Sequence, residues 1–440
     1  MGQGGKILLV NKTPYQWKKT HHHSYQMESW DSKFPIIIEP GTTASVYVEW
    51  ESGAYDEDDA GEINYELLGT GGQSFQVQAR NDNGYELKIF FINLSTAHHP
   101  NNTTLSLGWA HDGYVLFGLT GKSGSYELLA NGQGHSSWMK NIREDKKLTD
   151  LTLPGTHDTC ALYGGDLVQC QRMGLRDQLN AGIRFVDIRC RHFQDRFTIH
   201  HGNFYQHMNF TEVLTICLDF LKANNQETII MSVKAEKVAN SIAWDDPTCT
   251  RSFEQTFNWY LTEEHYGSQK GCAQQWYQDN KIPRLKDVRG KIVLFRRFET
   301  DTMRENKGIS APPAAWPDSE TFVIDNDNNN GVTIKVQDQY KVPTLFNIGD
   351  KWDKINGLLQ EANNGSREIL FVNFCSGVSG GAYPYSVAYK GDGVTIKGVN
   401  YRLLKEVAQH SSARYGIIPM DFPESPSNTL IPALIGLNEF

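Results

Sequence analysis

The chain has 440 residues, of which 39% are hydrophobic and 21% are charged, so it can bury a core and is not expected to be disordered. Its formal net charge of -9 argues against a nucleic-acid-binding protein, because such proteins usually carry a basic surplus. The sequence has no apolar run of the roughly 18 residues that would predict a transmembrane helix.

The start of the chain, MGQGGKILLV, lacks the regions of a signal peptide. We therefore expect a protein that is cytoplasmic or exported without a classical leader. Its seven cysteines form neither a CxxC pair nor a zinc-finger spacing, which predicts mostly free, buried thiols.

From residue 6 to about residue 129, apolar and polar residues alternate in short runs that end at turn residues. Eight runs are typical of strands: ILLVN, PIIIEP, SVYVEW, INYELL, SFQVQA, YELKIFFINL, TLSLGWA and YVLFGL. Asn83-Gly84 lies between two of them and predicts a tight hairpin turn. We expect an antiparallel β-sandwich over residues 1–130.

Three polar stretches in the chain have the composition of metal sites. They are the histidines His21 to His23, the acidic residues 55–61 and the DNDNNNG stretch at residues 325–331. The glycine of the last stretch is out of place for an EF-hand, and no helices are expected to flank it. We interpret all three as solvated loops.

A polar stretch rich in Gly and Ser, from Gly121 to Ser137, predicts a domain boundary. Beyond it, strand-like runs alternate with longer segments that are compatible with helices, which is typical of an α/β domain. The runs are LTDLTLPG, IRFVDIRCR, ETIIMSVKAE, KIVLFRRF, VTIKVQDQY, EILFVNF and YGIIPMDF. This second domain is expected over residues 136–440.

Each of these runs ends in polar or charged residues. In LTLPGTHDTC, we expect Pro154 and Gly155 to end the strand and present His157 and Asp158 in a turn. Later endings carry Asp187, Arg189, Lys234, Arg297, Asp338, Tyr340, Asn373 and Asp421, and FTIHHG adds His201. In a TIM-type barrel all such ends meet on one face, which carries the chemistry. The pattern therefore predicts a functional site.

The residue types at this site indicate an anionic substrate. Arg189, Lys234 and Arg297 are three cations in one place. Two histidines, His157 and His201, suit acid and base catalysis near neutral pH. Two imidazoles and an arginine can cleave a phosphodiester without a metal, and a neighbouring hydroxyl on the substrate would give a cyclic product first. A divalent ion is disfavoured by the charge of the arginine.

In order along the chain, LTLPGTHDT, GIRFVDIRCR with FTIHHG, ETIIMSVKAE, GKIVLFRRF and VTIKVQDQYKV closely resemble bacterial-type phosphatidylinositol-specific phospholipase C. The resemblance covers residues 138–440. It implies a distorted TIM barrel that cleaves phosphatidylinositol, and often glycosyl-phosphatidylinositol anchors, into diacylglycerol and a cyclic inositol phosphate.

The resemblance also implies roles for five catalytic residues. His157 would be the general base on the inositol 2-hydroxyl, and Asp421 would orient it. His201 would be the general acid towards the diacylglycerol oxygen, with support from Asp158. Arg189 would hold the phosphate.

Five further residues would bind the substrate. Lys234, Arg297 and Asp338 would contact inositol hydroxyls, and the Tyr340 ring would pack against the sugar. Asp187 would brace the site. From the residues alone, Lys234 and Arg297 could equally be ordinary charges at strand ends. Asp187 could equally be an ion-pair partner of Arg189.

Calcium-dependent relatives place acidic ligands near the phosphate, whereas this chain has Arg189 there, so the resemblance implies the metal-independent branch and no cofactor. Two alternatives remain open at this point. One is a metal-dependent glycerophosphodiester-type phosphodiesterase, although the expected cluster of carboxylates is missing. The other is a non-catalytic protein that binds lipid or glycan.

The first 130 residues lie outside the resemblance. A β-sandwich rich in Trp and Tyr suits a lipid- or glycan-binding module, and a packing domain fits equally well. We expect the partner to be the surface of a membrane that contains phosphatidylinositol, bound peripherally, and the protein to be a monomer without nucleic acid.

Overall fold

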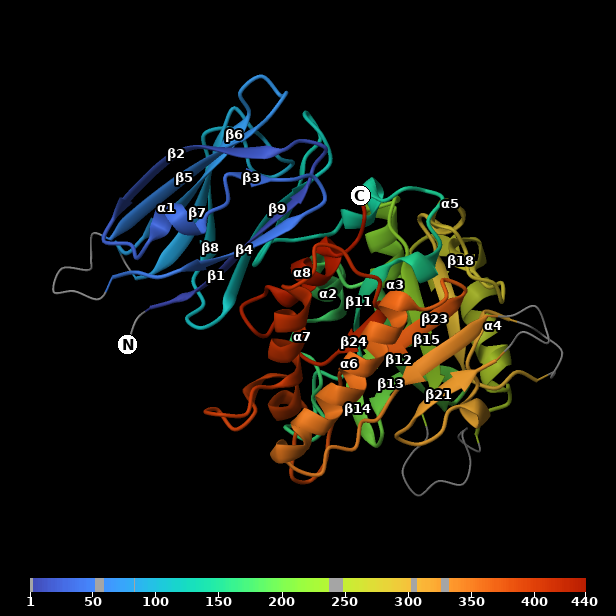
Figure 1. The fold of residues 1–440 in the computed structure, drawn as a ribbon. Helices are drawn as coiled ribbons and strands as arrows, with labels where there is room; N and C mark the ends of the chain where they lie inside the picture. Colours follow the sequence, from blue (N-terminus) through green and yellow to red (C-terminus); the bar gives the residue numbers. More distant parts are fainter. Residues whose placement is uncertain (1–2, 52–58, 83, 237–247, 302–306, 326–331) are drawn as a thin grey trace. The chain divides into compact units, whose positions relative to one another are not determined.

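The computed structural model describes residues 3–51, 59–82, 84–236, 248–301, 307–325 and 332–440 (Figure 1). Asn83 of the predicted hairpin turn and most of the polar stretches 55–61 and 325–331 lie outside these residues. The chain forms two compact units. Unit 1 comprises Met1–Ile142, Leu403–Ala413 and Glu424–Phe440, and unit 2 comprises Arg143–Arg402 and Arg414–Pro423.

Unit 1 contains two β-sheets that share one hydrophobic core. One sheet has the order β10-β9-β1-β4 and the other β3-β2-β5-β6-β7-β8. Trp17, Phe75 and Phe117 are fully buried between them. The strands are β1 (Gly5–Lys12), β2 (Trp17–Tyr25), β3 (Ile37–Ile38), β4 (Thr43–Val48), β5 (Ala60–Leu67), β6 (Ser74–Arg80), β7 (Glu86–Ile92), β8 (Thr104–Gly108), β9 (Tyr114–Thr120) and β10 (Glu127–Ala130).

Eight of these strands coincide with the eight predicted runs, and two were missed. The histidines His21 to His23 lie in β2, so their interpretation as a loop was wrong. They are polar because both faces of that part of the strand are exposed, while pairing with β5 holds the backbone extended. Strand β10 falls inside the stretch that we interpreted as the domain boundary, where it pairs with β9.

Two short helices belong to unit 1: α1 (Trp30–Lys33), which buries Trp30 in the core, and α8 (Leu430–Gly436). Unit 1 therefore draws on the last residues of the chain as well as the first. The predicted division at about residue 130 did not anticipate this contribution, and the predicted domain functions stay predictions.

Unit 2 is built on a largely parallel sheet with the order β18-β19-β15-β12-β11-β24-β23-β22-β21. Every neighbouring pair in this path is parallel except β21 with β22. Its strands are β11 (Thr152–Thr156), β12 (Phe185–Phe193), β15 (Ile229–Ala235), β18 (Trp276–Tyr277), β19 (Ile292–Arg297), β21 (Thr321–Ile324), β22 (Thr333–Gln337), β23 (Ile369–Asn373) and β24 (Gly416–Met420).

All seven runs predicted for this domain form strands: β11, β12, β15, β19, β22, β23 and β24. A hairpin of β13 (Arg196–His201) and β14 (Phe204–Asn209) extends from β12, and β20 (Ile309–Ser310) pairs with β19. Within the described residues, the path of paired strands ends at β18 and β21 and does not close on itself.

Helices separate these strands along the chain. They are α2 (Leu175–Ala181), α3 (Phe210–Ala223), α4 (Phe253–Thr262), α5 (Leu285–Val288), α6 (Ile348–Asn364) and α7 (Val399–Val407), which crosses from unit 2 into unit 1. Local sequence sets their ends. Asn209 caps α3 and Ser252 caps α4 through side-chain oxygens that accept backbone N–H bonds. Gly182 ends α2 with a φ of 114°, a conformation that favours glycine.

The pairing register places the predicted site residues at one level. Arg189 of β12 lies beside Lys234 of β15, and Lys234 lies beside Arg297 of β19. Thr156 of β11 pairs with Met420 of β24, so His157 and Asp421 follow at the same end of neighbouring strands. No helix in the described part of the chain is long and apolar enough to cross a membrane.

Candidate active site

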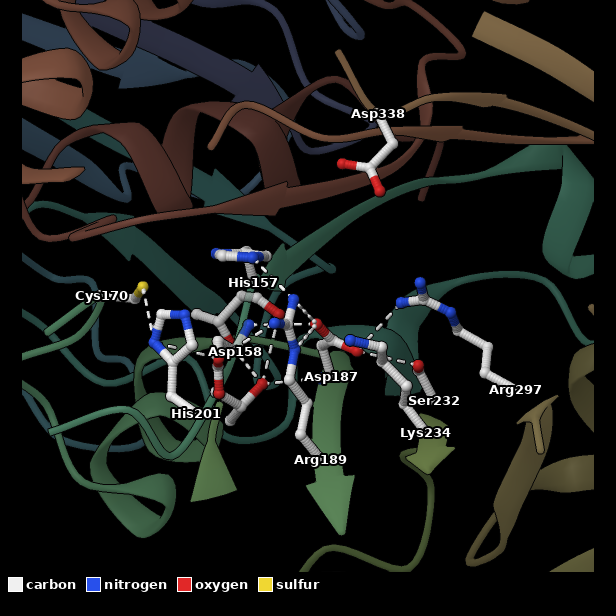
Figure 2. Close-up of polar contacts among 12 residues, drawn as sticks. His157, Asp158, Cys170, Asp187, Arg189, His201, Ser232, Lys234, Arg297 and Asp338 are labelled. Carbon is white, nitrogen blue, oxygen red and sulfur yellow. Dashed lines mark hydrogen bonds and ion pairs between the residues drawn. The ribbon is translucent and has the colours of Figure 1, made fainter. Parts of the chain in front are cut away.

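A pocket of about 450 Å³ opens at the carboxyl ends of the parallel strands. The predicted residues that line it are His157, Arg189, His201, Lys234, Arg297, Asp338, Tyr340 and Asp421. Asp158 and Asp187 do not line it, because both are fully buried beneath its floor. Figure 2 shows the side chains of His157, Arg189, His201, Lys234 and Arg297 gathered around Asp158 and Asp187.

His157 follows β11, and the strand reaches further than expected. Pro154 and Gly155 lie within β11, so the prediction that they end it was wrong. Gly155 is required by packing: a Cβ there would come 2.9 Å from the Cβ of Phe185 on the neighbouring strand. The predicted turn begins directly after the strand, at His157, and includes Asp158, which has a φ of 40°.

The His157 ring lies between a carboxylate and a guanidinium. Its Nδ1 is 2.8 Å from Oδ1 of Asp421, and its Nε2 is 2.7 Å from an Arg189 nitrogen. Since Arg189 can only donate, Nε2 carries the lone pair and Nδ1 carries the proton. Burial and the Arg189 charge hold the pKa of His157 well below its usual value, so the ring is neutral.

His201 ends β13 on the other side of the same arginine. Its Nδ1 donates to the backbone oxygen of Val168 at 2.7 Å and lies 3.3 Å from Oδ2 of Asp158. That same Asp158 oxygen is 3.2 Å from Arg189. With Nδ1 held in this way, Nε2 is the nitrogen of His201 that can exchange a proton with a ligand.

Asp187 organises the cations from beneath the pocket. Its Oδ2 accepts from Arg189 at 3.2 Å and from the backbone N–H of Asp158 at 3.1 Å. Its Oδ1 accepts from Ser232 at 2.9 Å and faces Arg297 at 3.4 Å. Burial alone would raise the pKa of Asp187, but the charges of Arg189 and Arg297 lower it, so the carboxylate is ionised.

Two residues of the pocket lining, Glu236 and Trp316, were not predicted from the sequence. Glu236 accepts from Lys234 at 2.7 Å and from the backbone N–H of Gly202 at 2.9 Å. Although burial opposes it, the charges of Lys234 and Arg189 lower the pKa of Glu236 to about 2. Glu236 comes two residues after Lys234 in the same run, and that period of two along a strand was the available signal.

An aromatic side chain, Trp316, also went unpredicted. The Arg297 guanidinium lies 3.6 Å from the centre of its indole ring, and the indole N–H donates to Asp338 at 2.9 Å. The Tyr340 hydroxyl donates to Asp318 at 2.6 Å. Trp316 lies outside every strand-like run, so no sequence pattern pointed to it.

Two clusters of described residues have donor atoms within 4.8 Å of one another, as a metal site requires. One consists of His157, Cys170 and Asp421, and the other of His192, Asp195 and Cys249. The cysteines carry free thiols, as predicted, and all are buried except Cys249, which is partly exposed. His200, next to His201, does not line the pocket and packs against Tyr205.

Comparisons with known proteins identify the family that this chain resembles. Residues 149–298 match the family model described as phosphatidylinositol-specific phospholipase C, X domain. The chain is 30% identical over 340 residues to a 1-phosphatidylinositol phosphodiesterase of Listeria monocytogenes, which covers 74% of this chain and 94% of that protein. It is 28% identical over 327 residues to one from Staphylococcus aureus, covering 72% and 93%.

Solved structures of phosphatidylinositol-specific phospholipase C are also similar to this chain. A mutant of phosphatidylinositol-specific phospholipase C from Staphylococcus aureus superposes with a TM-score of 0.58 at 26% identity, over 69% of this chain and 97% of that one. Another structure, from work on membrane binding of the same enzyme, gives a TM-score of 0.56 at 26% identity, over 70% and 98%.

The matched family model and the named relatives indicate a phosphodiesterase, here built on a largely parallel sheet. More particularly, the chain belongs to the bacterial-type phosphatidylinositol-specific phospholipase C family.

Proposed function

We propose that this protein cleaves phosphatidylinositol into diacylglycerol and a cyclic inositol phosphate by metal-independent acid and base catalysis. The named relatives act on phosphatidylinositol, as their descriptions state. One observation carries the mechanism: His157 and His201 line the same pocket and contact, from opposite sides, the unit formed by Arg189 and Asp158.

In the first step His157 is the general base. Its neutral ring, with the proton on Nδ1 bonded to Asp421, offers the Nε2 lone pair to the inositol 2-hydroxyl. Arg189 occupies that lone pair in the free protein. A phosphate oxygen takes over the Arg189 donor on binding, which frees Nε2 for the hydroxyl and stabilises charge on the phosphoryl group.

In the second part of the reaction His201 is the general acid. A proton on Nε2 passes to the diacylglycerol oxygen as the bond between phosphorus and that oxygen breaks. Asp158, 3.3 Å from Nδ1, stabilises the imidazolium before transfer. The attacking 2-hydroxyl remains on phosphorus, so the product is a cyclic phosphodiester. Each proton transfer contributes on the order of 10²–10⁴-fold.

The rest of the pocket suits a sugar with several hydroxyls. Lys234, Arg297 and Asp338 present donors and acceptors, and the Tyr340 ring offers an apolar face. Asp187 acts from below by orienting Arg189 and Arg297. We assign these five residues to substrate binding and its support, which are the roles that the family resemblance implies.

We infer that unit 2 is a distorted TIM barrel left open between β18 and β21, preceded by a β-sandwich that serves as a lipid- or glycan-binding module. The enzyme would act as a monomer, bound peripherally to a membrane surface that contains phosphatidylinositol. Glycosyl-phosphatidylinositol anchors share the same inositol phosphodiester and are a second substrate class of this proposal.

The test measures release of water-soluble inositol phosphate from phosphatidylinositol vesicles in the presence of EDTA. We expect the wild-type protein to be active, and His157→Ala to lose activity by at least about 10²-fold. His265→Ala is a matched control, because this exposed histidine of β16 (His265–Tyr266) lies outside the pocket.

Activity that appears only when calcium is added would favour the metal-dependent reaction and contradict the proposal. Absence of activity under both conditions, with vesicle binding intact, would indicate a non-catalytic lipid-binding protein. Analysis of the product separates attack by the inositol 2-hydroxyl from attack by water, because only attack by the 2-hydroxyl yields a cyclic inositol phosphate.

A further inference from the structure

Cys170 lies in the catalytic pocket, and no step proposed above uses it. Its side chain is buried, yet the residue is part of the pocket lining. The sulfur is 4.0 Å from Nδ1 of His201. It also lies within 4.8 Å of donor atoms of both His157 and Asp421. One thiol therefore lies close to both halves of the acid–base machinery.

Sulfur, imidazole nitrogen and carboxylate oxygen together form a zinc-type donor set. Three protein ligands of these kinds leave a fourth tetrahedral position for water. The thiolate selects soft cations over Ca²⁺ and Mg²⁺, which prefer oxygen ligands. The pocket provides the path by which an ion can reach these residues.

The charge around Cys170 also accommodates a cation. Asp158, Asp187 and Glu236 each form an ion pair with Arg189, Lys234 or Arg297. Asp421 differs from them, because it faces the neutral ring of His157. Neither oxygen of the buried Asp158 accepts a hydrogen bond from the described residues.

We propose that a cation of the zinc class binds to Cys170, His157 and Asp421 and switches the enzyme off. This inference rests on the proposed function only for its effect on turnover; binding itself does not depend on it. It differs from a catalytic metal site, because the ion takes the base away from the substrate.

Metal binding releases one proton from the protein and moves another between the two nitrogens of His157. A bond forms between zinc and sulfur, the S–H bond breaks, and the thiol proton leaves to solvent. Zinc also binds Nδ1 of His157, so the ring proton moves from Nδ1 to Nε2. Nε2 then has no lone pair for the inositol hydroxyl, and the Nδ1 hydrogen bond to Asp421 is lost. Arg189 gives up its contact with Nε2 but keeps its ion pairs with Asp158 and Asp187.

The first measurement uses the full chain, stripped of metal with a chelator, and Co²⁺ alone as the probe. Thiolate ligation gives a charge-transfer absorption band, which requires no turnover. We expect one Co²⁺ per chain with this band in the wild-type protein. We expect Cys170→Ser to lose the band and to bind Co²⁺ at least about 10-fold more weakly.

The control is Cys249→Ser, because Cys249 belongs to the other cluster with metal-site spacing. We expect this variant to keep the band. Loss of the band in Cys249→Ser with retention in Cys170→Ser would place the ion at the other cluster and overturn the proposal. Equal binding by both variants would also overturn it, as an adventitious ion only.

Turnover is then measured with Zn²⁺ against each protein's own activity in EDTA. Zinc should inhibit the wild type and Cys249→Ser at least about 10-fold and leave Cys170→Ser much less affected. Should Cys170→Ser not fold, anomalous diffraction at the zinc edge from wild-type crystals locates the ion directly. An inactive protein that shows the cobalt band would contradict the proposed function and not the metal site.

Discussion

Arg189 donates to Nε2 of His157 at 2.7 Å while Asp421 accepts from Nδ1 at 2.8 Å. The two partners together impose one tautomer on the imidazole, with its lone pair towards the pocket. A neutral ring with this orientation is what a general base requires. The same arginine pairs with Asp158, which also faces His201, so it connects the base to the acid.

Removal of the Arg189 charge should raise the pKa of His157. Burial and Arg189 both lower this pKa in the wild-type protein, because each disfavours the charged imidazolium. In Arg189→Gln the ring should therefore become protonated at a higher pH, and the acidic limb of kcat/KM should move to higher pH. NMR titration of the His157 ring measures this shift directly. A His157 pKa that stays unchanged or falls would show that the Arg189 charge does not hold the ring neutral.

Replacement of Asp421 by Asn should lower kcat by about 10³–10⁴-fold and leave KM almost unchanged. An amide can donate to Nδ1 and so stabilise the wrong tautomer, as the carboxylate-to-amide change does in other triads. Asp219→Asn, an exposed carboxylate of α3, serves as the control. Steady-state kinetics on dispersed phosphatidylinositol give both constants. An equal loss in the control variant, or a loss confined to KM, would argue against an orienting role.

The two histidines should respond differently to the leaving group. His201 donates a proton to the departing oxygen, so its removal matters less when that oxygen is a phenolate of low basicity. We compare the activity of each variant with that of the wild type on two substrates. For His201→Ala, this ratio should be at least about 10²-fold higher on an aryl inositol phosphate than on phosphatidylinositol. His157→Ala should recover nothing, because the base acts before the leaving group departs. Similar recovery in both variants would refute the assignment of acid and base.

Gln171 should act as a positioning residue. It is fully buried, and its amide donates to the backbone oxygen of His157 at 2.7 Å and to that of Met420 at 2.9 Å. It thus joins the base to the strand that carries Asp421. Gln171→Glu keeps the shape but loses the N–H donors, and we expect kcat to fall about 10²-fold with little change in KM.

A structural role for Gln171 alone predicts a different result. In that case the free energy of unfolding would fall while kcat of the folded fraction stayed the same. Denaturant unfolding and kinetics on the same samples separate the two outcomes. The His157 NMR signal should also shift in Gln171→Glu if the ring has moved.

Asp187 should contribute to stability as well as to activity. Its pKa is lowered in the folded protein by Arg189 and Arg297. A group with a lowered folded-state pKa stabilises the protein above its unfolded-state value, and this contribution is lost as the pH falls. Asp187→Ala removes the ion pair of the buried Arg297 and leaves Arg189 with Asp158 alone, so we expect a loss of about 3–5 kcal/mol in urea unfolding at neutral pH.

The pH dependence provides the control for Asp187. The difference in stability between wild type and Asp187→Ala should narrow as the pH falls from neutral into the acidic range. Asp338→Ala, which removes a carboxylate that accepts from the Trp316 indole, should change the unfolding free energy by less than about 1 kcal/mol. A constant difference across pH would exclude an electrostatic origin.

Sequence alone was sufficient for the elements that carry a periodic signal. Seven strands of the largely parallel sheet were predicted, because each is a short apolar run bounded by turn residues, whereas the two-residue β18 was missed. His157, Arg189 and Lys234 were predicted as a group for the same reason, since parallel strands bring their carboxyl ends together. Eight strands of unit 1 followed from alternation, whereas the exposed β2 lacked an apolar face and was missed.

Only the tertiary structure decided the contacts between residues far apart in the chain. The Trp316 ring against Arg297, the Gln171 amide between His157 and Met420, and the Cys170 sulfur beside both histidines follow no local pattern. The tautomer of His157 belongs to this group too, because Arg189 and Asp421 come from separate strands. Periodicity reports which face of a strand is buried, but a side chain's partners depend on how the strands pack.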